Sequence, residues 1–423
     1  MIMQTKQLFK NTDFLTESEI NAVVHESFSG NFRGEKVLVI IPDHTRTLPL
    51  PVFFKSLTTT LVDAEQLDFL VALGTHPSLS ESQLNKLVGV SPAQRRSEYK
   101  NIRIINHQWE NPEALVSIGT FEKDEIVALS GSSWHPSLPD RINIRINKII
   151  FDYDHILILG PIFPHEVIGF SGGAKYLFPG ISGPEITHAT HWLGALATVV
   201  NTIGIKETPV RLMVDAAARK VSVPISLIAC VMDGHDLAGI FIGDLFQAWE
   251  QAVELSYSRN ISWKQRRFEQ VLSCPPPMYD ELWTAAKAMY KIEPIVEQGG
   301  QVIVYAPHLD TVSLAHGKYI EQVGYHTLPY FLADWDAFSH YPLGVLAHST
   351  HFRGSGMMVD GVEKPNVDLY LASRISREDC EQLNLKYIDP AKIDLNAFID
   401  KEEDSILYVP DAGEKLYRYR KNE

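Results

Sequence analysis

Short apolar runs alternate with segments of helical spacing along the first third of the chain. The runs at 36–41, 69–73 and 102–105 are almost continuously apolar, and polar residues follow each of them. Between these runs, apolar residues recur at helical spacing over 53–62 and 81–88. Because the buried strands of a parallel sheet are apolar on both faces, this alternation predicts a parallel sheet with helices packed on it.

The alternation continues to the end of the chain. The further predicted elements are a strand at 149–159, a helix from residue 184, a hairpin at 223–242, a helix at 245–257, a strand at 271–274, a helix at 279–296 and a strand at 302–305. A polar, basic stretch ends at residue 267. We therefore predict an α/β fold of two α/β domains, 1–267 and 268–423, with mostly parallel sheets and an active-site cleft between them. The last strand, at 405–409, could return to the first domain.

Composition argues against several classes of protein. The 423 residues include 38 basic and 52 acidic side chains, a net charge of −14, which argues against nucleic acid or an anionic membrane as a partner. No apolar run approaches the ~18 residues of a membrane-spanning helix. The first residues lack the apolar stretch of a signal peptide, and the three scattered cysteines form no CxxC pair. We expect a cytoplasmic protein.

Histidines follow the predicted strands of the first domain. His44, His76 and His107 each come directly after a strand, at the edge where open α/β sheets bind ligands. Asp43 and Arg46 stand beside the first of them, and arginine binds carboxylates with two parallel hydrogen bonds. An Asx turn with a solvated arginine is the structural alternative for this segment.

The segment 164–183, PHEVIGFSGGAKYLFPGISG, holds the densest group of chemically useful residues. Gly172 and Gly173 allow backbone amides to approach a ligand, and a helix that follows such a loop favours an anion. Lys175 can neutralise a phosphate or act as a nucleophilic amine. The spacing matches neither the Walker loop nor the dinucleotide fingerprint. A tight turn with a surface lysine remains the structural alternative.

Further histidines differ in their surroundings. His188 and His191 are three residues apart, so on a helix both could face one metal ion, or one of them could simply pack. His135, His348 and His351 stand in loop-like sequence without nearby acids. For these three we predict structural roles.

Four of these motifs together resemble the lactate racemase family that uses a nickel-pincer nucleotide. They are DHTR at 43–46, LGTH at 73–76, NH at 106–107 and the segment 164–183. In that family, a pyridinium-derived mononucleotide holds nickel and is joined to a lysine, and separate maturation enzymes make it. The resemblance implies covalent attachment at Lys175, nickel ligation by His191, and general base roles for His76 and His165. It also implies cofactor contacts from Asp43, Arg46, Thr75, Gly172 and Gly173.

The resemblance implies inversion of the C2 centre of a 2-hydroxy acid, in which the cofactor accepts a hydride and two histidines handle the hydroxyl proton. One departure stands out. Where the lactate enzymes have Tyr-Gln-x-x-Lys against the substrate, this chain has Trp283, Thr284 and Lys287. Lys287 can still pair with a carboxylate, as Arg46 can. Because an amide is replaced by a shorter hydroxyl, we predict a substrate other than lactate.

Two alternatives belong to other classes of protein. A zinc hydrolase or lyase could be built from His165, His188 and His191, but it would leave Lys175 without a role. A non-catalytic binding protein of the same fold would be expected to lack one of the two bases, and both are present.

Overall fold

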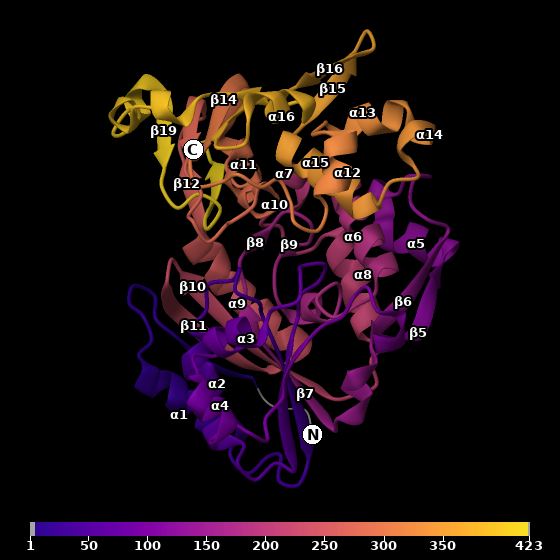
Figure 1. The fold of residues 1–423 in the computed structure, drawn as a ribbon, viewed down its shortest axis with the longest axis vertical. Coiled ribbons are helices and arrows are strands. Elements are labelled where there is room, and N and C mark those ends of the chain that lie inside the picture. Colours follow the sequence, from indigo (N-terminus) through magenta and orange to yellow (C-terminus); the bar gives the residue numbers. More distant parts are fainter. Residues whose placement is uncertain (1–4, 422–423) are drawn as a thin grey trace.

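The computed structural model describes residues 5–421, which form two sheets with helices around them (Figure 1). The first sheet has seven strands in the order β1-β11-β10-β7-β2-β3-β4. Five of them, from β10 to β4, run parallel, and β11 and β1 extend the sheet antiparallel at one edge. The strands are β1 (Lys6–Phe9), β2 (Lys36–Ile41), β3 (Gln66–Val71), β4 (Ile104–Asn106), β7 (His155–Pro161), β10 (Ile225–Asp233) and β11 (Asp236–Asp244).

Strand β2 shows why the apolar runs of this sheet are nearly continuous. Val37, Val39 and Ile41 point to one face and join the cluster that contains helices α1 and α2. Leu38 and Ile40 point to the other face and join the larger cluster that contains α6, α8 and α9. Both faces are therefore covered, as the apolar pattern predicted.

Helices and short strands complete the part of the chain before residue 267. The helices are α1 (Glu17–Phe28), α2 (Leu50–Thr60), α3 (Glu81–Leu87), α4 (Pro92–Arg96), α5 (Lys123–Ser130), α6 (Pro184–Ala197), α7 (Val199–Thr202), α8 (Pro209–Ala218) and α9 (Leu245–Asn260). Two short antiparallel pairs are β5 (Leu115–Glu122) with β6 (Arg141–Asn147), and β8 (Pro164–His165) with β9 (Gly169–Phe170).

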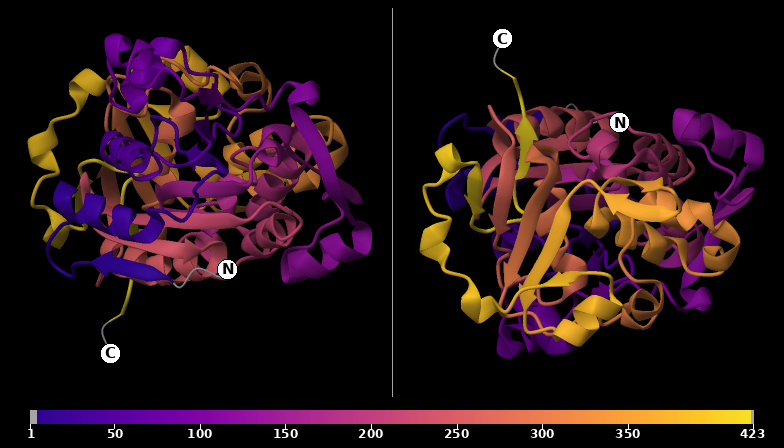
Figure 2. Two further views of the ribbon diagram at one scale, coloured as in Figure 1. Left: turned by 90° about the horizontal axis from the view of Figure 1, so that it is seen from below. Right: turned by 90° about the horizontal axis from the view of Figure 1, so that it is seen from above.

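The second sheet has five parallel strands in the order β18-β17-β14-β13-β19, seen from above in Figure 2. The strands are β13 (Phe268–Ser273), β14 (Val296–Ala306), β17 (Asp368–Ser373), β18 (Lys386–Tyr387) and β19 (Ile406–Val409). The helices are α10 (Leu282–Ala285), α11 (Lys287–Tyr290), α12 (Gly317–Val323), α13 (Leu328–Ala333), α14 (Trp335–Phe338), α15 (Leu343–Arg353) and α16 (Arg377–Gln382). Strands β15 (Gly356–Val359) and β16 (Val362–Pro365) form a hairpin that belongs to neither of the two large sheets. The prediction of an α/β fold with two mostly parallel sheets is confirmed.

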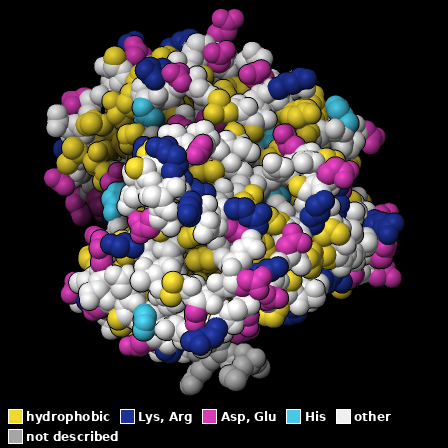
Figure 3. All heavy atoms as spheres, turned by 60° about the horizontal axis from the view of Figure 1, so that its bottom comes forward, with side chains coloured by type: hydrophobic (Ala, Val, Ile, Leu, Met, Phe, Trp, Pro, Cys, Tyr) yellow, Lys and Arg dark blue, Asp and Glu magenta, His cyan; other side chains and the backbone are white. Residues whose placement is uncertain are grey.

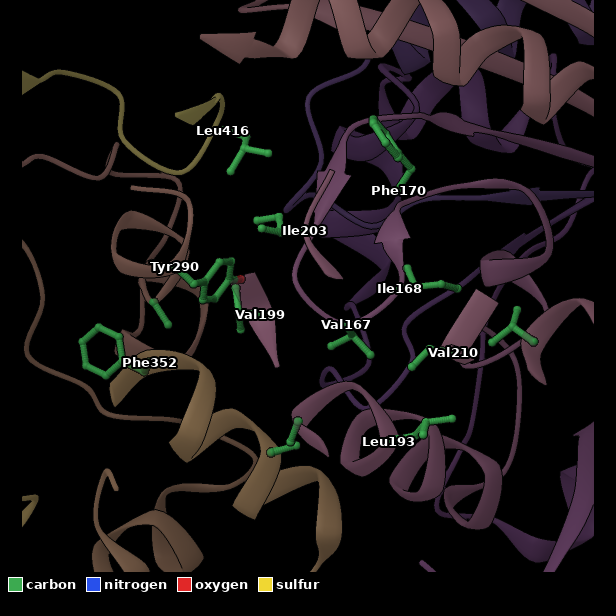
Figure 4. Close-up of a cluster of buried hydrophobic side chains, with 14 of the residues drawn as sticks. Val167, Ile168, Phe170, Leu193, Val199, Ile203, Val210, Tyr290, Phe352 and Leu416 are labelled. Carbon is green, nitrogen blue, oxygen red and sulfur yellow. The ribbon is translucent and has the colours of Figure 1, made fainter. Parts of the chain in front are cut away.

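The chain crosses between its two parts more than once. The strand at 406–409 belongs to the second sheet, whereas β20 (Leu416–Tyr419) returns and pairs with β12 (Ile261–Lys264). Buried side chains also form one cluster across both parts, which Figure 4 shows with Val199 and Ile203 facing Tyr290 and Leu416. The domain boundary at residue 267 stays a prediction.

Three predicted elements differ from the structure. The predicted helix 279–296 is divided into α10, α11 and a 3-10 turn at Glu293–Ile295. The regular pattern stops at Ala286, whose carbonyl accepts from the amide of Met289 three residues on, and Pro294 has no amide proton to continue a helix. The predicted strand 149–159 begins only at His155, because 148–152 form a 3-10 helix. His348 and His351, predicted to lie in a loop, lie on α15.

Acidic and basic side chains are interspersed over the face drawn in Figure 3. Within residues 5–421, none of the helices is long and apolar enough to span a membrane.

Candidate active site

The carboxyl ends of β2, β3 and β7 meet at one edge of the first sheet, facing the second part of the chain. Asp43 follows β2, His76 follows β3, and His165 lies just beyond β7 on the short strand β8. All three line one cavity. The parallel order of the strands explains this convergence, because parallel strands end at the same edge.

His76 is held by a buried carboxylate. Its Nδ1 lies 2.5 Å from Oδ2 of Asp43, and Oδ1 of Asp43 accepts from the amide and the hydroxyl of Thr45 at 3.0 and 2.6 Å. Although burial opposes it, the neighbouring His76 and Arg46 hold the pKa of Asp43 far below its usual value, so this carboxyl is ionised. Nδ1 of His76 therefore donates to it, which leaves Nε2 as a proton acceptor.

His165 has the opposite arrangement. It is buried, and its Nδ1 accepts from the amide of Val167 at 3.2 Å, which leaves the proton of the neutral ring on Nε2. Glu166 Oε2 lies 3.2 Å from the same Nδ1. Burial, together with the positive charges of Lys175 and Arg46, lowers the pKa of His165 well below its usual value. In this structure one histidine presents an acceptor and the other a donor.

Lys175 reaches the cavity from the glycine-rich segment. Gly172 precedes it with φ +74°, and a Cβ on Gly172 would lie 2.1 Å from Cδ1 of Ile162, so this position requires glycine. Burial, and then the positive charge of Arg46, lowers the pKa of Lys175 to about 7. A large share of this amine is uncharged, and hence nucleophilic, near neutral pH.

Helix α6 supplies a histidine with a free ring nitrogen. Nδ1 of His191 donates to the carbonyl of Thr187 at 2.7 Å, so Nε2 carries the lone pair that a metal ion requires. Burial lowers the pKa of His191 to about 4, which keeps the ring neutral. His188, one turn earlier, does not line the cavity and lies beside Gly344.

The second part of the chain closes the cavity with Trp283, Thr284 and Lys287. Lys287 Nζ lies 4.1 Å from the centre of the Tyr279 ring, and burial lowers its pKa well below the usual value. The neighbouring Lys291 is buried and donates to the carbonyl of Glu414 at 3.1 Å. The amino groups of two lysines thus lie at this end of the site.

Sequence reasoning missed two histidines of this cavity. His348 and His351, predicted to be structural, both line it from α15. The ring of His348 stacks on Trp283, with 3.7 Å between ring centres and 19° between planes. Their spacing of three residues, the same as that of His188 and His191, is the signal that could have revealed a shared helical face.

The other predicted residues take the following places. The cavity is lined by Asp43, Arg46, Thr75, His76, His165, Gly172, Lys175, His191, Trp283, Thr284 and Lys287. Gly173, predicted to contact a cofactor, is not among the residues that line the cavity, and a Cβ on it would lie 2.8 Å from Cδ1 of Trp249. Its cofactor contact stays a prediction. His107 is buried, with Nε2 donating to the carbonyl of Ser182 at 3.0 Å, and His135 bonds locally to Ser137. Both have structural partners.

His165, His188 and His191, the ligands of the alternative zinc site, do not come together in the structure. Among residues 5–421, no three or more His, Cys, Asp or Glu side chains are grouped so that they could hold a metal ion by themselves. His188 lies outside the cavity that His165 and His191 line.

Comparison with known proteins agrees with this arrangement. Residues 13–133 and 137–203 match the lactate racemase N-terminal domain, which includes every strand-end residue of the cavity and Lys175 and His191. The matched residues make up less than half of the chain, so the similarity to this family is shown for the first part of the chain.

Two curated lactate racemases have recognisable sequence similarity to this chain. The enzyme of Thermoanaerobacterium thermosaccharolyticum is 24% identical over 284 residues, which are 66% of this chain and 61% of that protein. The enzyme of Lactiplantibacillus plantarum is 24% identical over 289 residues, 65% and 61% of the two chains. The matched region thus spans about three fifths of the length of these relatives.

Two solved structures share the fold. The crystal structure of a Thermotoga maritima protein superposes with a TM-score of 0.88 at 28% identity, covering 98% of this chain and all of that one. The lactate racemase apoprotein of T. thermosaccharolyticum superposes with a TM-score of 0.69 at 19% identity, covering 96% and 93%. The lactate racemase fold therefore extends over both parts of this chain.

The buried Lys175 of the cavity predicts a pH-dependent gain of stability when it is replaced. The pKa of Lys175 falls from 10.5 to about 7 on folding, so below pH 7 the folded protein bears the cost of a buried charge. Between pH 7 and pH 10.5, Lys175 is protonated mainly in the unfolded chain. The cost of the buried charge therefore falls as the pH rises through this range. Lys175→Met should therefore raise the free energy of unfolding of the apoprotein by about 1–3 kcal/mol at pH 6, and by less at pH 9.

Urea unfolding at the two pH values checks this prediction. Lys148→Met removes an exposed lysine and serves as the control. An equal gain at both pH values would show that the effect comes from packing and not from the charge.

Proposed function

We propose that this protein is a racemase or epimerase that inverts the C2 centre of a 2-hydroxy acid. The observation that carries the proposal is the pairing of His76 and His165, which line one cavity with opposite hydrogen-bonding roles. An enzyme that works on both faces of a planar carbon needs, on each face, a group that takes the hydroxyl proton of one stereoisomer and returns it in the reverse direction, and a histidine can do both. Supporting this, the curated relatives are lactate racemases.

The residues of the cavity also fit the nickel-pincer nucleotide of this family. Lys175 offers a buried amine with a lowered pKa for covalent attachment, and His191 offers Nε2 for the metal. Gly172 and Arg46 line the same cavity. The glycine leaves its backbone open to a ligand, and the arginine can bind the phosphate of a mononucleotide. When bound, the group would supply an electron-poor centre that accepts hydrogen from C2 with its electron pair.

The histidines would handle the hydroxyl proton. In one direction Nε2 of His76 accepts it, and Asp43 stabilises the imidazolium that forms because it is ionised and bonded to Nδ1. In the other direction His165 would take the proton at Nε2, which requires the tautomer with the ring proton on Nδ1, 3.2 Å from Oε2 of Glu166. Glu166 would then stabilise the protonated ring. The low pKa of His165 favours prompt return of the proton.

The second part of the chain would bind the substrate carboxylate. Lys287 reaches the cavity from α11, and Arg46 faces it from the end of β2. Trp283 and Thr284 stand beside Lys287 and bound the space left for the remainder of the substrate. Because Thr284 is shorter than the glutamine of the lactate enzymes and its hydroxyl bonds back to the carbonyl of Glu281 at 3.0 Å, we propose a substrate other than lactate.

The test uses protein co-produced with nickel and the cofactor-maturation enzymes. We expect an intact-mass increase of nucleotide size and about one nickel per chain, as a single tethered group requires. Pure enantiomers of 2-hydroxy acids should then be inverted in D₂O without solvent deuterium at C2, because hydride transfer does not exchange with water. Zinc in place of nickel without a mass increase, or inversion with full deuterium incorporation, would contradict the proposal.

A further inference from the structure

Two ring nitrogens of the cavity lack partners. Within residues 5–421, Nε2 of His348 and Nε2 of His351 are buried and have no hydrogen-bond partner. The side chains themselves are 8% and 3% exposed, and both line the cavity. Because an unsatisfied polar atom in a buried position is costly, a pair of them in one cavity indicates a ligand that supplies the missing hydrogen bonds.

The two histidines form a wall together with Trp283. Both lie on α15, which packs against α6 (Figure 1), and the stacking on Trp283 fixes the ring of His348. A third histidine, His316, has its ring centre 4.5 Å from that of Trp283, and its Nε2 forms a hydrogen bond with Oγ1 of Thr75 at 3.2 Å. The wall is therefore rigid and polar, and it adjoins the residues proposed to hold the substrate carboxylate.

We propose that His348 and His351 recognise hydroxyl groups that the substrate carries beyond C2. This inference rests on the proposed function and names its substrate class, which is a polyhydroxylated 2-hydroxy acid of the aldonic acid type. A substrate with an aliphatic or aromatic group beyond C2 would leave Nε2 of both histidines without a hydrogen bond. A substrate hydroxyl supplies that bond and so removes the free-energy cost of the unsatisfied nitrogens. A second carboxylate would find no cation on this wall, whereas a hydroxyl can donate to or accept from a neutral imidazole in either tautomer.

The experiment compares two five-carbon acids on the holoenzyme: 2,3,4,5-tetrahydroxypentanoate and 2-hydroxypentanoate. The wild-type protein should invert the first with the higher kcat/KM. His348→Phe and His351→Phe keep an aromatic ring and remove the nitrogens, so each should lower the ratio of the two kcat/KM values by about 10- to 100-fold. His340→Phe, at an exposed position outside the cavity, is the control and should leave the ratio unchanged.

Nickel content and added mass are measured for every variant. If a variant loses the cofactor, its nitrogen contacts that group and the inference fails for that residue. A wild-type preference for 2-hydroxypentanoate, or an equal loss on both acids, would overturn the inference while leaving the proposed function intact. Failure of the wild-type holoenzyme to invert any 2-hydroxy acid would instead overturn the proposed function.

Discussion

Lys175→Ala is expected to abolish C2 inversion, by more than about 1,000-fold, because no side chain can replace the hydride acceptor that the proposed tethered group would supply. The variant should also lack the mass increase of the wild-type holoenzyme. Lys175→Arg should behave in the same way, since a guanidinium keeps the charge but cannot form the covalent attachment. Intact mass, nickel content and inversion rate, measured on protein co-produced with the maturation enzymes, check all three expectations.

The exposed Lys148→Ala is the matched control and should keep the wild-type mass and activity. An unchanged mass increase in Lys175→Ala would place the attachment elsewhere. Retention of activity in Lys175→Arg would favour a role for this residue as a simple cation, as in a metal hydrolase.

His76→Gln and His165→Gln should each slow inversion by about 100- to 10,000-fold, the usual contribution of a general acid or base. The covalent group and the nickel should remain, because neither residue is proposed to hold them. The two variants should also differ in which enantiomer they oxidise more slowly, since each removes the group that serves one stereoisomer. Single-turnover measurements starting from each enantiomer would reveal this difference.

Asp43→Asn provides a finer test of the same pair. Asparagine cannot stabilise an imidazolium at His76 as the ionised carboxylate does, so the loss of activity should approach that of His76→Gln.

Loss of nickel or of the added mass in His76→Gln or His165→Gln would mean that these residues organise the cofactor and would contradict their assignment as bases.

Much of the site near the first sheet could be predicted from the sequence. Asp43, His76 and His165 follow apolar strands, and parallel strands bring their ends together whatever the details of packing. Lys175 could be singled out because closely spaced glycines precede it. These are local signals, and the structure places all four residues in one cavity.

The wall of His348 and His351 could not be predicted in the same way. Its place in the cavity depends on the packing of α15 against α6, a contact between segments about 150 residues apart in the sequence that no local pattern encodes. The contact of Gly173 with Trp249 is likewise not encoded in the glycine-rich pattern, because that pattern does not show what surrounds each glycine.

The buried cluster that joins the two parts of the chain also bears on the order of events during synthesis. Val199 and Ile203 leave the ribosome long before Tyr290 and Leu416, which they face in the folded protein (Figure 4). The nascent first part therefore carries an uncovered apolar surface until the last strands are made. Because the cavity also needs Trp283 and His351, the site is complete only after both of these residues have been synthesised, and the proposed attachment of a group at Lys175 in that site would follow their synthesis.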